Sequence, residues 1–291
     1  MTAQEMLDNL GSRLEDPSKK AFPPAFRLQS LENAQIVVAS LFPNDLLTSL
    51  EVVDSNESVS SSKVALTNLT YDVLKGIMGI VNVKNYNGLW CNIINIGDLK
   101  STESGLYTPS TQFTLAYLFA NAVYPLPTSL TALDIYYLKM PKPLRHAFTM
   151  AANDPASTTT FIGDASQGLS ALADVYNGAV IYNVLTGNYH IVTDYAVTTR
   201  TFTVSPARSG ATTWSNADTF YFVTGDFFLL NLDNVTCELD SSFHDIVVTL
   251  AEVECWLRKN SLERANKALE IAYSDIQSII SQRNEITGIG E

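Results

Sequence analysis

The spacing of apolar residues changes twice along this chain, from a helical period to a strand period and back. Residues 1–62 and 232–291 repeat their apolar side chains every three or four positions, which is typical of amphipathic helices. Residues 63–145 and 146–231 instead contain short runs of β-branched and aromatic residues separated by turn residues. This order predicts an α+β fold: N- and C-terminal helices form one bundle, antiparallel β regions project from it, and the second region is a wing or insertion.

The N-terminal segment predicts two helices and a short helical piece. Thr2 and Glu5 have the spacing of a capping box, and the helix that they begin stops at the Asp16-Pro17 pair. A second helix is expected over residues 24–42, and Asn44 is expected to cap the short piece that follows. Residues 55–62 are polar and predict an exposed loop.

The middle of the chain predicts eight strands. Turn residues favour tight turns at 85–88 and at 186–188. The expected strands are residues 77–83, 89–96, 114–119, 130–138, 178–185, 189–195, 200–205 and 219–223.

The C-terminal segment predicts a helical hairpin. Ser242 with Asp245 begins its first helix, and Asn260 with Glu263 begins the second. The second helix carries a seam for packing against neighbouring helices, which includes Leu262, Leu269 and Ile276.

The charge balance argues against a protein that grips nucleic acid. The chain has 18 Lys and Arg against 30 Asp and Glu, a formal net charge of -12. No lysine occurs between Lys142 and Lys259. Because tight binding to phosphate backbones depends on basic side chains that release counterions, we expect this chain to repel DNA.

The sequence also bears on the compartment. Cys91, Cys237 and Cys255 form no CxxC pair and are odd in number, which favours a reducing compartment. Acidic residues near the N-terminus are atypical of a secretory signal peptide. Prolines interrupt the long uncharged stretch 104–133, so no membrane span is expected.

Sequence motifs of enzymes are largely missing. The chain has no phosphate-binding loop, dinucleotide fingerprint or HExxH motif. Ser166 lies in a Gly-rich loop, but Asp164 stands where a nucleophile elbow needs glycine. His190 and Asp194 are expected on one face of a strand, as a surface pair without the third partner of a catalytic site. We therefore expect no catalytic residues, and His146, His190 and His244 are expected to be structural.

No cofactor or metal site is expected either. Asp233, Glu238 and Asp240 could bind a hard cation, but acids at a helix N-terminus explain them more simply. Tyr117, Tyr124, Tyr136 and Tyr137 are predicted to crowd one sheet, either in its core or on a face that binds a partner.

Several passages, in order along the chain, resemble head-tail adaptor proteins of tailed bacteriophages. Residues 124–127, Tyr-Pro-Leu-Pro, followed by 133–141, are similar to the Y-P-x-P, strand, Y-x-x-x-P passage of that family. Residues 23–43 resemble its helical opening, and 247–268 its helical ending. Residues 178–206 look like a β module of phage structural proteins. The stretch 146–172 has no counterpart in the family.

The resemblance implies a virion structural protein that acts by assembly. Such an adaptor, made in the host cytoplasm, forms a homo-oligomeric ring of about twelve copies in the virion neck, between the portal protein and a tail or nozzle protein. Genome DNA passes through the ring during ejection without sequence-specific binding. The C-terminal segment, with Arg283, Ile286, Ile289 and Glu291, would dock on the portal.

Two other classes remain open. A tail or baseplate binding module could use Tyr-rich β faces to bind a host glycan. A hydrolase would use Ser166 or His190.

Overall fold

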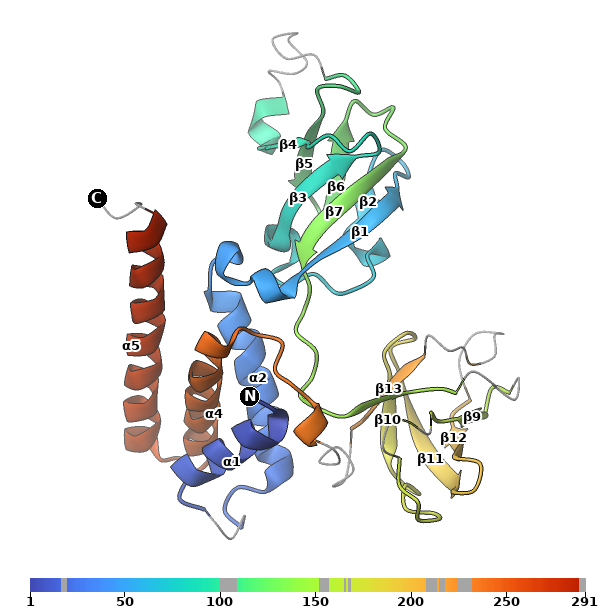
Figure 1. Ribbon diagram of the computed structural model, residues 1–291, viewed down its shortest axis with the longest axis vertical. Helices are drawn as coiled ribbons and strands as arrows, with labels where there is room; N and C mark the ends of the chain where they lie inside the picture. Colours follow the sequence, from blue (N-terminus) through green and yellow to red (C-terminus); the bar gives the residue numbers. More distant parts are fainter. Residues whose placement is uncertain are drawn as a thin grey trace. The chain divides into compact units, whose positions relative to one another are not determined.

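A computed structural model describes residues 1–16, 20–99, 109–151, 157–164, 166, 169–207, 214, 218–223 and 232–287. The chain divides into two compact units, each built from three separate stretches of sequence (Figure 1). The first unit comprises Met1–Glu32, Pro143–Cys237 and Val248–Glu270, and the second comprises Asn33–Lys142, Glu238–Val247 and Ile271–Glu291.

Four α-helices lie in the described part of the chain. Thr2 caps the first of them with the predicted capping box, because its Oγ1 accepts a hydrogen bond from Glu5 N at 3.1 Å and its N donates to Glu5 Oε2 at 2.8 Å. None of these helices is both long enough and apolar enough to cross a membrane. The helices are α1 (Ala3–Arg13), α2 (Pro24–Leu41), α4 (His244–Arg258) and α5 (Leu262–Thr287).

Three of the predicted helix starts need correction. Asn44 caps nothing with its side chain, which donates to the carbonyl of Met78 instead. Asp240, rather than Ser242, caps the turn before α4, since its carboxylate accepts from Ser242 N. Asn260 ends α4: it has a left-handed φ of 55°, and Ser261 N donates back to Trp256 O, as in a Schellman motif.

The described strands form three sheets. The first has the order β1-β7-β3, the second β2-β6-β5-β4, and the third β8-β13-β10-β11-β12-β9. The strands are β1 (Glu51–Ser58), β2 (Val64–Ala65), β3 (Ile80–Asn85), β4 (Asn92–Ile94), β5 (Leu115–Phe119), β6 (Ala122–Leu126), β7 (Ala132–Leu138), β8 (Ala147–Thr149), β9 (Thr160–Ile162), β10 (Val180–Asn183), β11 (Asn188–Ala196), β12 (Thr201–Ser205) and β13 (Thr219–Phe222).

The predicted fold class is wrong. The described chain is mostly β-sheet with four helices, and it is not a helical bundle from which β regions project. The physical reason is that the strands bury large cores of their own, so the sheets are not appendages of a helical core.

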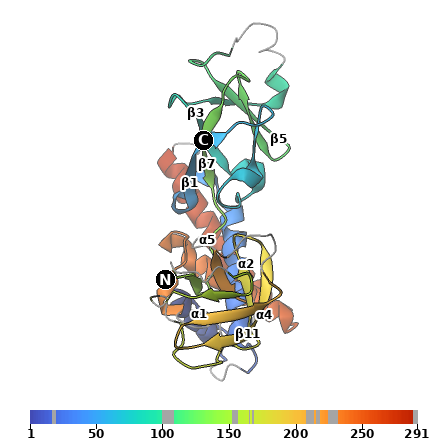
Figure 2. The same cartoon turned by 90° about the vertical axis from the view of Figure 1, so that its right-hand side faces the viewer.

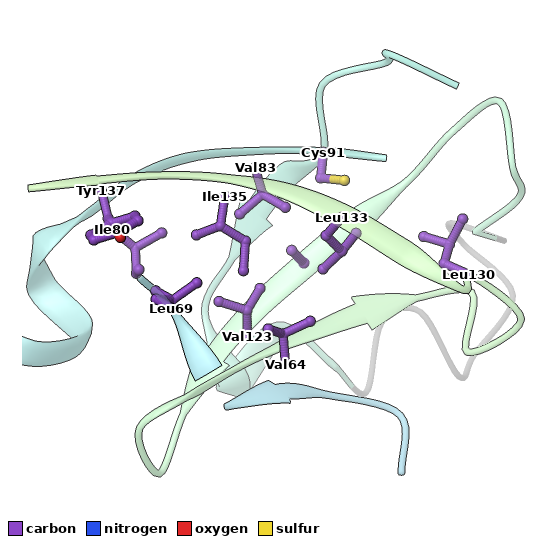
Figure 3. Close-up of a cluster of buried hydrophobic side chains, with 11 residues drawn as sticks. Val64, Leu69, Ile80, Val83, Cys91, Val123, Leu130, Leu133, Ile135 and Tyr137 are labelled. Atoms are coloured by element: carbon purple, nitrogen blue, oxygen red, sulfur yellow. The ribbon is translucent and has the colours of Figure 1, made fainter. Parts of the chain in front are cut away.

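The first two sheets pack face to face around an aliphatic core in the second unit. Figure 2 shows β5 on one side and β1, β3 and β7 on the other. Side chains from both sheets point toward each other between them (Figure 3). This sandwich core comprises Val64, Leu69, Ile80, Val83, Cys91, Ala116, Val123, Leu130, Leu133, Ile135 and Tyr137.

The third sheet, in the first unit, curls until its two edge strands meet. An isolated bridge joins Met150 beyond β8 to Gly163 beyond β9, and Ala151 N donates to Ile162 O at 2.8 Å. A Cβ on Gly163 would lie 2.4 Å from Leu169 Cδ1 and 3.0 Å from Phe202 Cε2, so a larger residue at this closure would displace the Leu169 side chain. The buried interior is mainly aromatic: Phe148, Phe161, Tyr176, Tyr195, Phe202, Phe220 and Phe222.

Strand β1 takes up residues 55–58 of the loop that was expected over 55–62, and Ser61 and Ser62 form a turn. The strand pairs antiparallel with β7 along its length, with a bulge between Asp54 and Glu57. Asn56, at the bulge, has a φ of 62°, and its N donates to Asp134 Oδ1 at 2.8 Å. An edge strand needs few apolar residues, and a bulge blunts its free edge, which explains the polar sequence.

Both predicted tight turns are confirmed. At 85–88, Gly88 has a φ of 77° and its N donates to Asn85 O, although the residues that follow reach β3 only through the Lys84–Trp90 bridge. At 186–188, Gly187 has a φ of 68° and joins β10 to β11 in a hairpin.

Candidate functional site

The described surroundings of Ser166 lack the partners of a nucleophile. Ser166 Oγ donates to Asp164 Oδ1 at 2.8 Å, and Ser166 N donates to the same oxygen. The bond from Ser166 N, above all, lowers the pKa of Asp164 below its ordinary value, so this carboxylate stays ionised as an acceptor. The pair forms a local turn, and the lowered pKa makes the Asp164 carboxylate a weak base that is poorly suited to activate the hydroxyl.

His190 and Asp194 do not share a face of the sheet. Strand β11 carries a bulge between Val192 and Asp194, which shifts the alternation by one residue. His190 is therefore buried inside the curled sheet, where its Nδ1 lies 2.8 Å from the carbonyl of Pro206, and Asp194 is exposed. The predicted surface pair is wrong.

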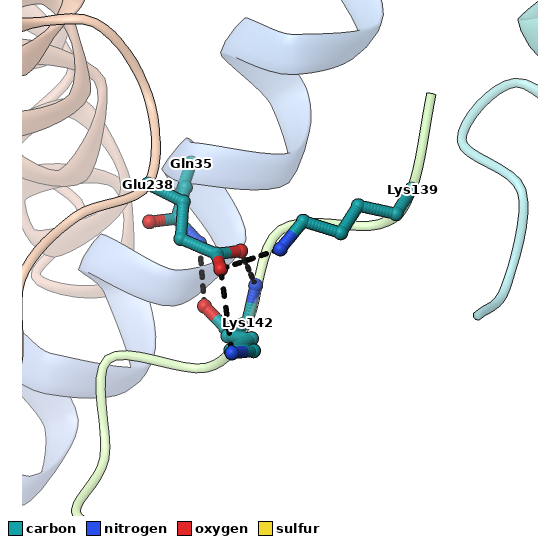
Figure 4. Close-up of polar contacts among 4 residues, drawn as sticks. All are labelled: Gln35, Lys139, Lys142 and Glu238. Carbon is teal, nitrogen blue, oxygen red and sulfur yellow. Dashed lines mark hydrogen bonds and ion pairs between the residues drawn. The ribbon is translucent and has the colours of Figure 1, made fainter. Parts of the chain in front are cut away.

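The acids before α4 contact protein groups. Glu238 accepts from Lys139 Nζ at 2.6 Å and from Lys142 N at 2.8 Å, while Gln35 Nε2 donates to Lys142 O at 2.8 Å (Figure 4). Asp240 is the cap described above, and Asp233 lies in the turn Leu232–Asn234. In the part of the chain that the structure describes, no group of three His, Cys, Asp or Glu side chains is placed to hold a metal ion.

The other two histidines are not part of a described cluster. His244 begins α4, and its Nε2 lies 2.9 Å from Leu239 O. Burial lowers the pKa of His244 below its ordinary value, against the effect of this hydrogen bond. His146 lies half-buried just before β8.

Helix α2 has apolar side chains on two faces of its C-terminal half. Val38 and Ala39 are fully buried, whereas Ile36, Val37 and Leu41 are 37, 46 and 51% exposed. The exposed three lie within one helical face, since positions 37 and 41 are one turn apart. We call Ile36, Val37 and Leu41 the α2 face. Our sequence predictions missed this face, although the run of consecutive apolar residues at 36–39 is its visible signal.

The predicted seam of α5 is only partly buried. Ile276 is buried and Leu269 half-buried, whereas Leu262 is 63% exposed and lies outside the packed row. The buried row consists mainly of small residues, namely Ala265, Ala268 and Ala272. Leu262 is therefore not a packing residue within this chain, because it stands at the helix start, one turn before the row begins.

Two of the four predicted docking residues, Arg283 and Ile286, lie near the C-terminal end of α5. Arg283 Nε donates to Asp45 Oδ2 at 2.6 Å, so it already has a partner in its own chain. Ile286 belongs to the helix by its backbone, while Ile289 and Glu291 lie outside the described residues.

The four tyrosines expected in one sheet are divided between two. The rings of Tyr117 and Tyr124 stack 4.8 Å apart on β5 and β6, whereas Tyr136 and Tyr137 lie on opposite faces of β7. Tyr137 is in the core: its hydroxyl donates to Asp54 Oδ2 at 3.0 Å and accepts from Tyr71 N at 3.1 Å. Alternation along β7 separates the last two, as it does along any strand.

A different tyrosine row crosses the outer face of the curled sheet. Tyr182 lies directly opposite Tyr189 on one side and Tyr221 on the other. Tyr189 is 58% exposed, and its ring lies 5.0 Å from that of Tyr182. The signal in the sequence is the alternation of tyrosine with buried residues in both strands of this hairpin.

The comparisons with known proteins add no relative. No protein-family model matches the chain, and no curated protein matches it.

Proposed function

We propose that this protein is a virion structural protein, a head-tail adaptor that forms a ring between the portal and the tail of a bacteriophage. The ordered resemblance of its helical ends and its Tyr-Pro-Leu-Pro passage to that family supports this proposal. The proposal concerns assembly and assigns no catalytic step to the protein.

The observation that carries the proposal is the α2 face. A helix with apolar side chains on both sides is typical of one that is covered on both sides. Ile36, Val37 and Leu41 are exposed in the single chain, so a neighbouring copy would bury them in a ring.

The acidic composition supports a conduit for DNA. With a net charge of -12, a ring of about twelve copies would present DNA with a repulsive surface, and DNA would pass without the counterion release that holds it in place. In this proposal the C-terminal segment beyond Arg283 contacts the portal, and β structure contacts the next tail protein.

Electron microscopy of the protein co-expressed with the portal protein of its own genome tests the proposal. We expect a ring stacked coaxially on the portal. Val37→Asp should abolish the ring and leave the melting temperature of the monomer nearly unchanged, because the substituted position is exposed. Thr131→Asp, which adds the same charge at another exposed position, is the matched control and should assemble normally. Free monomers of the unmodified protein beside bare portals would contradict the proposal.

The tyrosine row favours a second candidate, a tail component that binds a glycan. The exposed ring of Tyr189, beside the half-buried ring of Tyr182, suits the apolar face of a sugar. Glycan-array binding that is lost in Tyr189→Ala but kept in Tyr86→Ala, which alters an exposed tyrosine elsewhere, would support this alternative. An array without signal would exclude it.

A further inference from the structure

A basic pocket lies in the first unit, beside the start of α2 and the end of α4. Its volume is about 350 Å³. The lining consists of two phenyl rings, two small residues and three cationic side chains: Lys20, Ala21, Phe22, Pro23, Phe26, Arg258 and Lys259.

The three cations have no acid partner within the described chain. Lys20, Arg258 and Lys259 form no ion pair with a described residue. Other cations of the same unit are paired, as in Arg27 with Asp16 at 2.9 Å and Arg145 with Glu32 at 2.6 Å. In a chain where acids outnumber bases, three cations around one cavity that pair with no described acid indicate a site that attracts an anion.

Helix ends explain part of this arrangement. Cations at the C-terminus of α4 complement its macrodipole, which accounts for Arg258 and Lys259. That effect does not account for Lys20, which precedes α2. The first turn of α2 contains no acidic residue, so its positive end adds to the field of the three cations.

The aromatic rings of the pocket already have partners within the chain. The Arg258 guanidinium lies 4.0 Å from the centroid of the Phe26 ring, and Phe22 is buried, with its ring edge-to-face with Trp256 at 5.3 Å. Nucleobase binding would need a free ring face for stacking. Arg258, held by this contact, instead presents donors that match a carboxylate.

We propose that this pocket binds an acidic segment of a protein partner. Arg258, Lys259 and Lys20 surround a carboxylate, and Pro23 with the edge of Phe26 contacts the apolar part of the segment. The proposal is independent of ring formation.

Calorimetric titration of the full chain with hexaglutamate at low ionic strength tests the site. We expect saturable binding that weakens about tenfold in the double variant Arg258→Gln/Lys259→Gln, since two charge-assisted contacts are lost. The double variant Lys63→Gln/Lys267→Gln changes the net charge equally at residues that do not line the pocket, and should bind like the unmodified protein. A melting curve confirms that each variant is folded, and Lys20→Gln alone, in the segment before α2, should weaken binding by a smaller factor.

Titrations with other anions show whether the pocket prefers an acidic peptide, a nucleic acid or a small anion. Hexathymidylate binding more tightly than hexaglutamate would overturn the proposal in favour of a nucleic-acid site. Inorganic phosphate competing as well as hexaglutamate would overturn it in favour of a small-anion site. Equal binding by the pocket variant and the control variant, or no binding of hexaglutamate at all, would also refute it.

Discussion

The two β regions of this protein bury their strands in different ways. The sandwich of the second unit packs two sheets around Val, Leu and Ile side chains, and the curled sheet of the first unit fills itself with rings. Phe148 alone has four phenylalanine rings within 6.4 Å, measured between centroids. A short sheet that faces itself has few inward positions, so each must supply more volume than an aliphatic residue offers.

In both regions, buried tyrosine hydroxyls form hydrogen bonds with the backbone of a neighbouring segment. Tyr137 in the sandwich uses its buried hydroxyl to hold the segment at Tyr71, with help from Asp54. Inside the curled sheet, Tyr195 Oη donates to Ser170 O at 2.9 Å and Tyr176 Oη accepts from Ser170 N at 2.7 Å. In both regions a buried hydroxyl positions a loop, which is why these core residues are tyrosines and not phenylalanines.

The largest expected effect compares the two cores directly. Phe202→Ala should lower the free energy of unfolding by about 4 kcal/mol, and Leu133→Ala by about 3 kcal/mol, because the lost ring leaves the larger cavity. Denaturant unfolding followed by circular dichroism measures both. A larger loss for Leu133→Ala would show that the curled sheet can collapse around a missing ring.

The next effect concerns the buried hydroxyl of the sandwich. Tyr137→Phe should cost about 2 kcal/mol of unfolding free energy, since the N–H of Tyr71 and the Asp54 carboxylate each lose a partner. Tyr136→Phe, on the outer face of the same strand, serves as the control and should change little. Equal losses in the two variants would mean that the Tyr137 hydrogen bonds add nothing to stability.

A smaller effect is expected where β7 leaves the sandwich. Glu238→Gln should cost about 1.5 kcal/mol, because the side chain of Lys139 is only 12% exposed and would lose its charge partner. Lys142→Gln should cost less than about 1 kcal/mol, since that side chain is 59% exposed. Thermal melts of both variants at low and high salt measure the two losses. A larger loss for Lys142→Gln than for Glu238→Gln would contradict this prediction.

The smallest expected effect is a dependence on pH. Burial lowers the pKa of His244, so the unfolded chain takes up a proton before the folded chain does as pH falls through 6.5. The contribution of His244 to stability is therefore complete above pH 6.5 and is lost as pH falls toward the folded pKa. Asp240 and Asp245 oppose the lowered pKa, and burial outweighs them. As pH decreases across this range, the denaturant midpoint should decrease in the parent protein and in His146→Gln. The decrease should be smaller in His244→Gln.

Local features could be predicted from the sequence, and pairing across long distances could not. The Thr2 cap and the turns at Gly88 and Gly187 depend on neighbouring residues, and all three are confirmed. Strand β1 is too polar to be recognised without its partner β7, and the short strands β8 and β9 carry no clear period.

The same limit applies to the candidate site and the fold class. The bulge in β11 separates His190 from Asp194, and no residue near it signals the shift. The pocket joins Lys20 to Arg258, which are far apart in the sequence, so only the folded chain brings them together. The fold class was wrong because apolar runs predict strands but do not reveal how completely those strands enclose a core.

The contact between Lys142 and Glu238 has a consequence for how sequence can be inserted or exchanged. Lys142 N and Glu238 Oε2 are 2.8 Å apart although 96 positions separate them in the chain. The two ends of the segment Pro143–Cys237 therefore lie close together. Loop-closure entropy depends only weakly on loop length. Once Lys142 and Glu238 are held together, lengthening or shortening the segment between them changes that entropy little. A segment exchanged between Lys142 and Glu238 would also have to restore the contacts of Pro143–Cys237 with Met1–Glu32, such as the ion pair of Arg145 with Glu32.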